Sequence, residues 1–200
     1  DIMSIQKKID ITFSNKSDNY VKMNTKGIHY TLINSYRRIL FSMIETFAFD
    51  NFEVKKNKTK LTNEFITHRI ELIPINQILI NNELKKNEKI NSVEDIVFTL
   101  DVSCDTSKDS LYIFSGDIKS KDGKKYFKED IIIHKLFGGE ELHITMNLKK
   151  SIGNEHSKWT PITVCEYDYG GKENYDENDE IKDIDEYNVN LGIEQVGQMN

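Results

Sequence analysis

Two groups of side chains in this sequence are of types that could do chemistry. Cys165 and His156 could supply a nucleophile and its general base, and His134, His143 and His156 could supply nitrogen ligands for a metal ion. No nucleophile motif surrounds Cys165, and no carboxylate or cysteine stands at ligand spacing from the histidines. His143 also falls on the polar side of a predicted strand, where it faces solvent. The sequence therefore argues against catalysis and against a metal site, and Cys165 is expected to pack as a small apolar side chain.

Composition narrows the class of protein further. Cys104 and Cys165 are the only cysteines and lie far apart, which indicates a reducing compartment rather than a disulfide scaffold. Of the 200 residues, 38% are hydrophobic and 30% are charged, and no apolar run approaches the roughly 18 residues of a membrane helix. The chain starts at Asp1 without a charged-then-apolar leader, so no secretory signal is expected. A net charge of -6 argues against extended contact with nucleic acid.

The use of arginine points toward binding. The 27 basic residues include only three arginines, Arg37, Arg38 and Arg69, and the abundance of Lys, Asn and Ile is typical of an AT-rich genome. Where lysine is the default, an arginine indicates a need for the planar guanidinium group. We therefore expect Arg37 and Arg38 to bind a carboxylate or a backbone carbonyl of a partner. The alternative is ordinary surface charge on a helix.

The strongest helical pattern lies between Gly27 and Phe47. One side of this helix is apolar and is predicted to bury, and it carries Leu32, Ile33, Tyr36, Ile39, Leu40, Met43, Ile44 and Phe47. Arg38 falls on the far side, in line with Asn34 and Phe41. A single exposed aromatic is common, but one between an Arg and an Asn is unusual. We interpret the helix as two-sided, with one face for its own core and one for a partner.

Two further stretches carry candidate binding residues. Thr62 has the chemistry of an N-cap, and Pro74 closes a short helix that presents Glu64, His68 and Arg69. The second stretch precedes a predicted strand from Ile162 to Tyr167, contains the only tryptophan, and consists of Glu155, His156, Lys158 and Trp159. Trp159 is expected to be substantially buried. This stretch is either a binding loop or a polar turn.

Alternating apolar residues predict several strands around these helices. The predicted strands are Ile5 to Phe13, Phe47 to Val54, Ile96 to Val102, Ile131 to Phe137, Leu142 to Leu148, Ile162 to Tyr167 and Tyr187 to Ile193. Gly138-Gly139 is predicted to form a hairpin turn. Asn15 to Asn24 and Asn81 to Ser92 are polar and predicted to be turn or loop, and the acidic stretch from Gly170 to Glu186 is expected to be mobile.

Three segments match a known family. NSYRRIL (34–40), NEFITHRIELIPI (63–75) and KKSIGNEHSKWTPITVCEYDY (149–169) resemble signature stretches of the RNA polymerase assembly subunits, which are the bacterial alpha, archaeal D and eukaryotic third-largest subunits. LYIFSGDI (111–118) and YNVNLGIEQVGQ (187–198) resemble the same family. The resemblance implies an α+β fold of two domains. Residues 1–55 plus 184–200 would form a dimerisation-type domain, and 56–183 an inserted α/β domain.

The resemblance also implies a role and partners. The chain would be a non-catalytic subunit that forms a heterodimer with a smaller alpha-like subunit and then docks the second-largest subunit and a small zinc-binding subunit, meeting DNA only through the complex. The implied partner-binding residues are Asn34, Arg37, Arg38, Phe41, Glu64, His68, Arg69, Glu155, His156, Lys158 and Trp159. In many relatives the region of Asn81 to Ser92 holds a cysteine-rich metal insert, but it has no cysteine here, so no metal or cofactor is expected. The alternative is a stand-alone protein-interaction module that reuses the fold.

The family resemblance sets two more expectations. Relatives continue after the returning strand with a long helix that packs on the first helix across the dimer, whereas this sequence ends at Asn200. We expect either a longer product or a partner chain to supply that helix and cover Leu32, Tyr36, Leu40 and Met43. The composition suggests an AT-rich large DNA virus of eukaryotes or a protist, with a nuclear location or a cytoplasmic viral factory.

Overall fold

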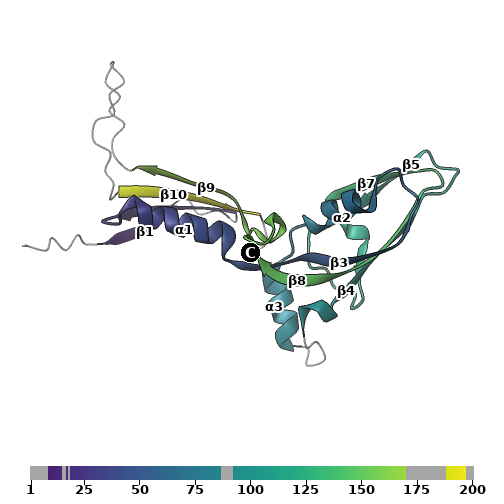
Figure 1. Cartoon of the computed structure of the whole chain (residues 1–200), viewed down its shortest axis with the longest axis horizontal. Helices are drawn as coiled ribbons and strands as arrows, with labels where there is room; N and C mark the ends of the chain where they lie inside the picture. Colours follow the sequence, from purple (N-terminus) through teal and green to yellow (C-terminus); the bar gives the residue numbers. More distant parts are fainter. Residues whose placement is uncertain (1–8, 15–16, 18, 87–91, 170–187, 197–200) are drawn as a thin grey trace, which may run out of the picture. The chain divides into compact units, whose positions relative to one another are not determined.

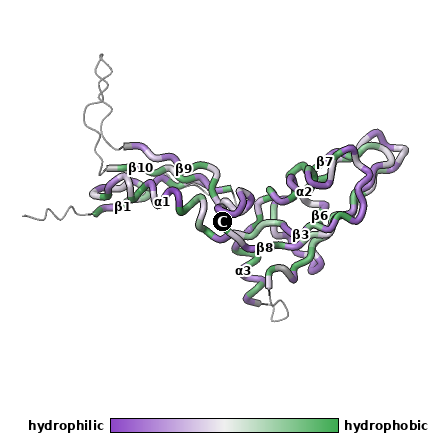
Figure 2. Tube along the Cα trace, in the orientation of Figure 1, coloured by the Kyte–Doolittle hydropathy of each residue, from purple (hydrophilic) through white to green (hydrophobic). Residues whose placement is uncertain are grey.

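The computed structural model describes residues 9–14, 17, 19–86, 92–169 and 188–196. It divides into two compact units (Figure 1). The first unit contains the described residues up to Ile44 and those of Thr160–Val196, and the second unit contains the described residues of Glu45–Trp159. Hydrophobic and hydrophilic residues alternate along the strands of both units (Figure 2). The mixture of helices and antiparallel strands confirms the predicted α+β class.

The units are divided at other residues than the sequence suggested. The structure divides the chain after Ile44 and after Trp159, whereas the family resemblance implied boundaries at 55/56 and 183/184. The first boundary differs because β3 (Glu45–Asn57) pairs with β8 (Glu141–Ile152) and so belongs to the second unit. The second differs because β9 (Ile162–Tyr169) pairs with β10 (Asn188–Gln195) in the first unit.

The first unit is a four-stranded antiparallel sheet with one helix on it. Its strand order is β1-β2-β10-β9, with β1 at Asp10–Ser14 and β2 at Tyr20–Lys26. The helix α1 (Tyr30–Ser42) packs on β9 and β10. The buried core residues are Met23, Ile33, Ile162, Cys165, Val189 and Leu191.

Two predictions about the first unit are wrong in detail. Asn15 to Asn24 was predicted to be turn-like, but β2 begins at Tyr20, because Met23 and Thr25 alternate inward while the strand pairs on both edges. The predicted helix from Gly27 to Phe47 is shortened at both ends. Gly27 has a φ of 76°, outside the helical region, and the helix begins after His29, whose side chain accepts a hydrogen bond from Thr31 N.

The second unit is a larger α+β unit. Its main sheet has the order β3-β8-β4-β6, with β4 at Val97–Ser103 and β6 at Ile118–Ser120. The strands β5 (Ser110–Phe114) and β7 (Ile132–Phe137) form a separate two-stranded sheet. The helices are α2 (Asn63–Glu71) and α3 (Gln77–Lys86), and short 3-10 turns occur at Val93–Asp95, Ser115–Asp117 and Ser157–Trp159.

Two sequence predictions fail in the second unit. Gly138-Gly139 does form a turn, in which Glu140 N donates to Phe137 O, but it is not a hairpin, because β7 pairs with β5 while β8 pairs with β3 and β4. The stretch from Asn81 to Ser92 was predicted to be a loop, yet α3 continues to Lys86. Its buried side carries Ile80 and Glu83, and Lys124 Nζ forms an ion pair with the Glu83 carboxylate at 2.5 Å.

Candidate functional site: exposed surfaces on both units

The helix α1 has a buried side, an apolar exposed side and a polar exposed side. Ile33, Leu40 and Phe41 pack in the core of the first unit. A second apolar row, 43% to 64% exposed, follows helical spacing and consists of Leu32, Tyr36, Ile39 and Met43. We call this row the open helix stripe. The predicted single core face is therefore wrong, because half of the apolar side turns away from the sheet. The expected lack of cover is confirmed for Leu32, Tyr36 and Met43, whereas Leu40, which was named with them, packs against the core.

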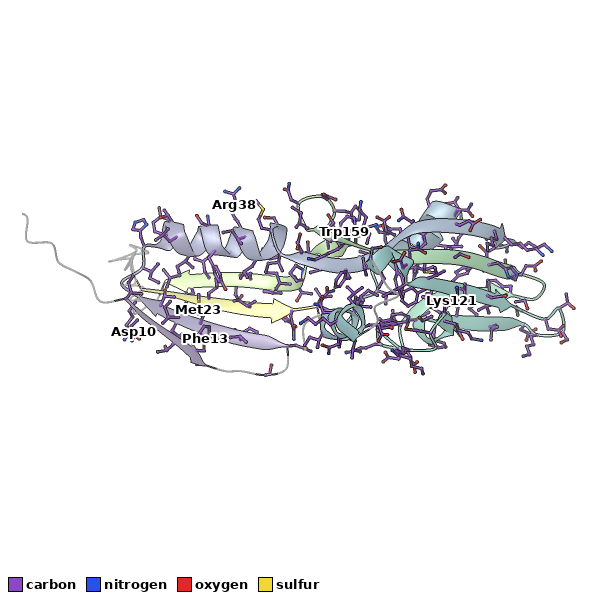
Figure 3. The ribbon with its side chains drawn as sticks, turned by 90° about the horizontal axis from the view of Figure 1, so that it is seen from below. Asp10, Phe13, Met23, Arg38, Lys121 and Trp159 are labelled. Atoms are coloured by element: carbon purple, nitrogen blue, oxygen red, sulfur yellow. The ribbon has the colours of Figure 1, made fainter. Side chains whose placement is uncertain are left out.

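The two arginines of α1 have different surroundings. Arg37 is half-buried, and its Nε donates a 3.1 Å hydrogen bond to Asn34 Oδ1. Its guanidinium carbon lies 6.0 Å from the centre of the Phe41 ring. Arg38 is exposed, and its side chain has no hydrogen-bond or ion-pair partner among the described residues; it points away from the sheet in Figure 3. Arg38 is thus the α1 cation that is available to another chain, whereas Arg37 and Phe41 are held within the unit.

The edge strand β1 adds apolar surface beside α1. Ile11 pairs with Thr25 and Phe13 pairs with Met23, so these β1 side chains share the sheet face that α1 covers. They remain 47% and 55% exposed because α1 lies over β9 and β10. The first unit therefore carries apolar surface on the open helix stripe and on β1.

In the second unit, α2 exposes a mixed apolar and basic side. Thr62 Oγ1 accepts a hydrogen bond from Phe65 N at 3.4 Å, which confirms the predicted N-cap. Ile66 and Ile70 are buried, so the opposite side of α2 carries exposed side chains. These include Glu64, Phe65, His68, Arg69 and Leu72.

Two of the predicted segments meet at this helix. The rings of His68 on α2 and His156 lie with centroids 6.5 Å apart and nearly perpendicular planes. His156 and Glu155 are exposed, and both precede the turn at Ser157–Trp159. We call Phe65, His68, Leu72 and His156 the α2 surface. The sequence predicted the binding residues of each segment but not that the two histidines would lie together.

Lys158 and Trp159, by contrast, turn into the second unit. Trp159 is 4% exposed, which confirms its expected burial, and its Nε1 donates to Lys149 O at 3.1 Å. The Lys158 ammonium lies 3.0 Å from Glu71 Oε2 and 3.4 Å from Asp50 Oδ1. It also lies 4.6 Å from the centre of the Trp159 ring. These contacts fasten the loop that carries His156 to α2 and β3.

The structure gives the reactive side chains ordinary roles. Cys165 is buried in the core of the first unit, as expected of a small apolar side chain, and burial raises the pKa of its thiol to about 11. His156 belongs to the other unit. His143 lies on the polar face of its strand as predicted, 2.8 Å from Asp101 Oδ1, and burial lowers the pKa of His134. No group of three potential metal ligands occurs within the described ranges.

Comparison with known proteins identifies the family. The model for the RNA polymerase Rpb3/RpoA insert domain matches residues 45–163, which is more than half of the chain and begins where the second unit begins. The chain belongs to the Rpb3/RpoA family of RNA polymerase subunits. This membership confirms the resemblance seen in the sequence.

Three relatives of this Rpb3/RpoA-family chain are named as subunits of DNA-directed RNA polymerases. The Rpo3 subunit of Methanosphaera stadtmanae is 30% identical over 184 residues, covering 90% of this chain and 67% of that subunit. Rpo3 of Pyrococcus furiosus is 30% identical over 154 residues, covering 76% and 56%. Subunit 3 of Arabidopsis thaliana RNA polymerases II, IV and V is 27% identical over 173 residues, covering 76% and 54%. The chain thus spans between about half and two thirds of the length of these relatives.

Among the helices that the described residues form, none is long and apolar enough to cross a membrane.

Proposed function

We propose that this Rpb3/RpoA-family chain is a non-catalytic assembly subunit of a multisubunit DNA-directed RNA polymerase. It forms a heterodimer with a smaller alpha-like subunit, either separate or fused, through the open helix stripe. The observation that carries this proposal is the row of large apolar side chains that α1 leaves exposed although it has a core of its own. Burying a side chain of this size contributes about 1.5–3 kcal/mol, so a partner that covers the row is strongly favoured.

Docking of the second-largest polymerase subunit is assigned to polar residues on both units. Arg38 supports this part of the proposal because its guanidinium is exposed and has no partner among the described residues. The α2 surface supports it because two separate family segments meet there at His68 and His156. Glu64, Arg69 and Glu155 are exposed on the same two segments, and Arg69 Nη2 also donates to Ile132 O at 3.2 Å. Lys158 and Trp159 act by positioning the loop rather than by touching the partner.

The remaining parts of the proposal follow from family membership. A small zinc-binding polymerase subunit is a further partner, and DNA is met only through the assembled complex. The location is that of the host enzyme, which is nuclear for a eukaryotic polymerase or a cytoplasmic factory for a viral one. The alternative of a stand-alone protein-interaction module makes a different prediction, because such a module would not co-purify with large polymerase chains.

Co-expression with the other polymerase subunits tests the proposal. The double variant Leu32→Ser/Met43→Ser removes two side chains of the open helix stripe and should reduce recovery of the smaller alpha-like subunit at least about tenfold. The matched control Ile78→Ser/Leu79→Ser changes two apolar residues of α3 that are similarly exposed, and it should assemble normally. Recovery of the wild-type chain without any large polymerase chain would favour the stand-alone module. Unchanged pairing of the stripe variant would remove the assigned interface.

A further inference from the structure

The two-stranded sheet of β5 and β7 has a second apolar side that its own unit does not use. In its register Ser110 pairs with Phe137 and Tyr112 with Lys135, and after a register shift between Ile113 and Phe114 the next pair is Phe114 with Ile132, so these residues share one side. Four large apolar side chains on this side are 39% to 50% exposed, and we call them the ribbon face: Tyr112, Phe114, Ile132 and Phe137.

The other side of the same ribbon already supplies the core. Ile113, Ile133 and Leu136 are buried in the hydrophobic cluster of the second unit. An antiparallel pair with one buried side ordinarily turns polar side chains to water on the other. The ribbon face departs from that pattern, and packing within the unit does not explain its four apolar side chains.

Two lysines lie against the ribbon face without a carboxylate. Lys135 Nζ is 5.1 Å from the centre of the Tyr112 ring and 5.6 Å from that of Phe137, and Lys60 Nζ is 5.7 Å from the Phe137 ring. Within the described ranges neither ammonium group forms an ion pair. Lys56 and Lys58, by contrast, are both paired with one Glu141 oxygen. The ribbon face is therefore apolar with positive charge at its edge, in a chain whose net charge is -6.

Two carboxylates at the ends of the ribbon face accept hydrogen bonds from its backbone. Asp117 Oδ2 accepts from Phe114 N at 2.8 Å, and Glu140 Oε2 accepts from Phe137 N at 2.9 Å. These fixed negative charges at both ends of the face oppose a long polyanion such as a nucleic acid. Isolated carboxylates of a partner can still reach Lys60 and Lys135 between the two negative charges.

We propose that the ribbon face docks a segment of a partner protein in which apolar side chains stand beside carboxylates. The apolar side chains cover Tyr112, Phe114, Ile132 and Phe137, and the carboxylates pair with Lys60 and Lys135. Aromatic side chains and cations of this kind dominate the binding energy of protein interfaces. This inference concerns a surface other than the open helix stripe and the α2 surface, and it does not depend on the polymerase role.

Fluorescence anisotropy with the purified full chain tests the proposal. The probe is a labelled synthetic peptide in which Leu and Phe alternate with Glu, and the matched peptide carries Lys in place of Glu. The chain should bind the Glu peptide better than the Lys peptide. Binding should weaken at least about tenfold in Tyr112→Ser/Phe137→Ser and in Lys135→Glu, and added salt should weaken it further. The controls Ile78→Ser/Leu79→Ser and Lys119→Glu change exposed residues elsewhere and should bind as the wild type does.

Three results would overturn the proposal. The first is absent or equal binding of the two peptides, which would remove the charge preference. The second is equal loss in the ribbon-face and control variants, which would place the binding elsewhere. The third is tighter binding of a labelled oligouridylate than of the Glu peptide, lost in Tyr112→Ser/Phe137→Ser, which would make the ribbon face a platform for single-stranded RNA. None of these three results depends on heterodimer formation through the open helix stripe. The proposed function and the proposed ribbon-face site can therefore be disproved independently.

Discussion

The ring of His156 lies 6.5 Å from the ring of His68, and this contact joins a loop before β9 to the middle of α2. The loop has little regular structure apart from the turn at Ser157–Trp159, so its position depends on contacts beyond the histidines. The buried ammonium of Lys158 supplies them, because it lies against Glu71 at the end of α2 and Asp50 on β3. The buried Lys158 therefore fixes the position of the loop and, with it, the exposed pair of His68 and His156.

Replacing Lys158 with Met should destabilise the second unit. The variant leaves Glu71 and Asp50 without their cation, and we expect a loss of about 2–3 kcal/mol in the free energy of unfolding, because both carboxylates keep some contact with water. Urea denaturation measures the loss of stability, and acrylamide should quench the fluorescence of Trp159 more readily in the variant. Lys150→Met, which breaks the exposed pair with Glu45, should cost no more than about 1 kcal/mol. Equal stabilities of the two variants would contradict the role given to Lys158.

Substitution of Arg38 should affect docking, whereas substitution of Arg37 should affect stability. Arg38→Ala should change the free energy of unfolding by less than about 0.5 kcal/mol, because the side chain is exposed. It should weaken binding of the second-largest subunit by about 2–5 kcal/mol if its charge is buried there. Arg37→Ala should instead lower stability by about 0.5–1.5 kcal/mol, since it loses the Asn34 hydrogen bond and the packing on Phe41. Thermal denaturation and a pull-down measure the two effects, and normal docking of Arg38→Ala would exclude the assigned contact.

Glu141 should make stability depend on pH in the acid range. Hydrogen bonds from Lys56 and then Lys58 lower the pKa of its carboxyl from 4.5 to about 2 in the folded chain. Its stabilising effect is therefore complete above pH 4.5 and is lost as the pH falls toward 2. Wild type and Glu141→Gln should differ by a constant free energy of unfolding at neutral pH, and the difference should shrink across this window. A difference that is independent of pH would show that the lysines do not hold the charged form.

Cys165 should resist alkylation in the folded chain. Its side chain is buried in the core, and the raised pKa leaves almost no thiolate at neutral pH. Mass spectrometry after maleimide treatment should show no label on Cys165 or on buried Cys104 until denaturant is added. An introduced cysteine, Ile78→Cys, should react at once because that position is exposed. Rapid native labelling of Cys165 would mean that α1 lifts from the sheet far more often than its packing suggests.

Local signals in the sequence predicted the elements that depend on local chemistry. The Thr62 N-cap, the end of α2 before Pro74 and the alternation in β9 and β10 follow from short-range sterics and hydrogen bonding. The C-terminal half of α3 had no such signal, and its helical conformation depends on Glu83, whose ion-pair partner Lys124 is distant in sequence. The helical periodicity also predicted correctly which residues form the apolar side of α1. It could not predict which of them pack on the sheet of the first unit and which remain exposed. The meeting of His68 and His156 needed the tertiary fold.

The sheet of the first unit has a consequence for how the chain is made. Thr25 on β2 donates a buried hydrogen bond to Val189 O on β10, 164 residues later in the sequence. The second unit lies between these partners as one continuous stretch and can fold while the ribosome is still working. The first unit, with β10 between β2 and β9, closes only after Gln195 has emerged. Nascent chains that stall before β10 is made therefore lack a finished sheet under α1, and the open helix stripe is not set on a complete sheet until β10 has been synthesised.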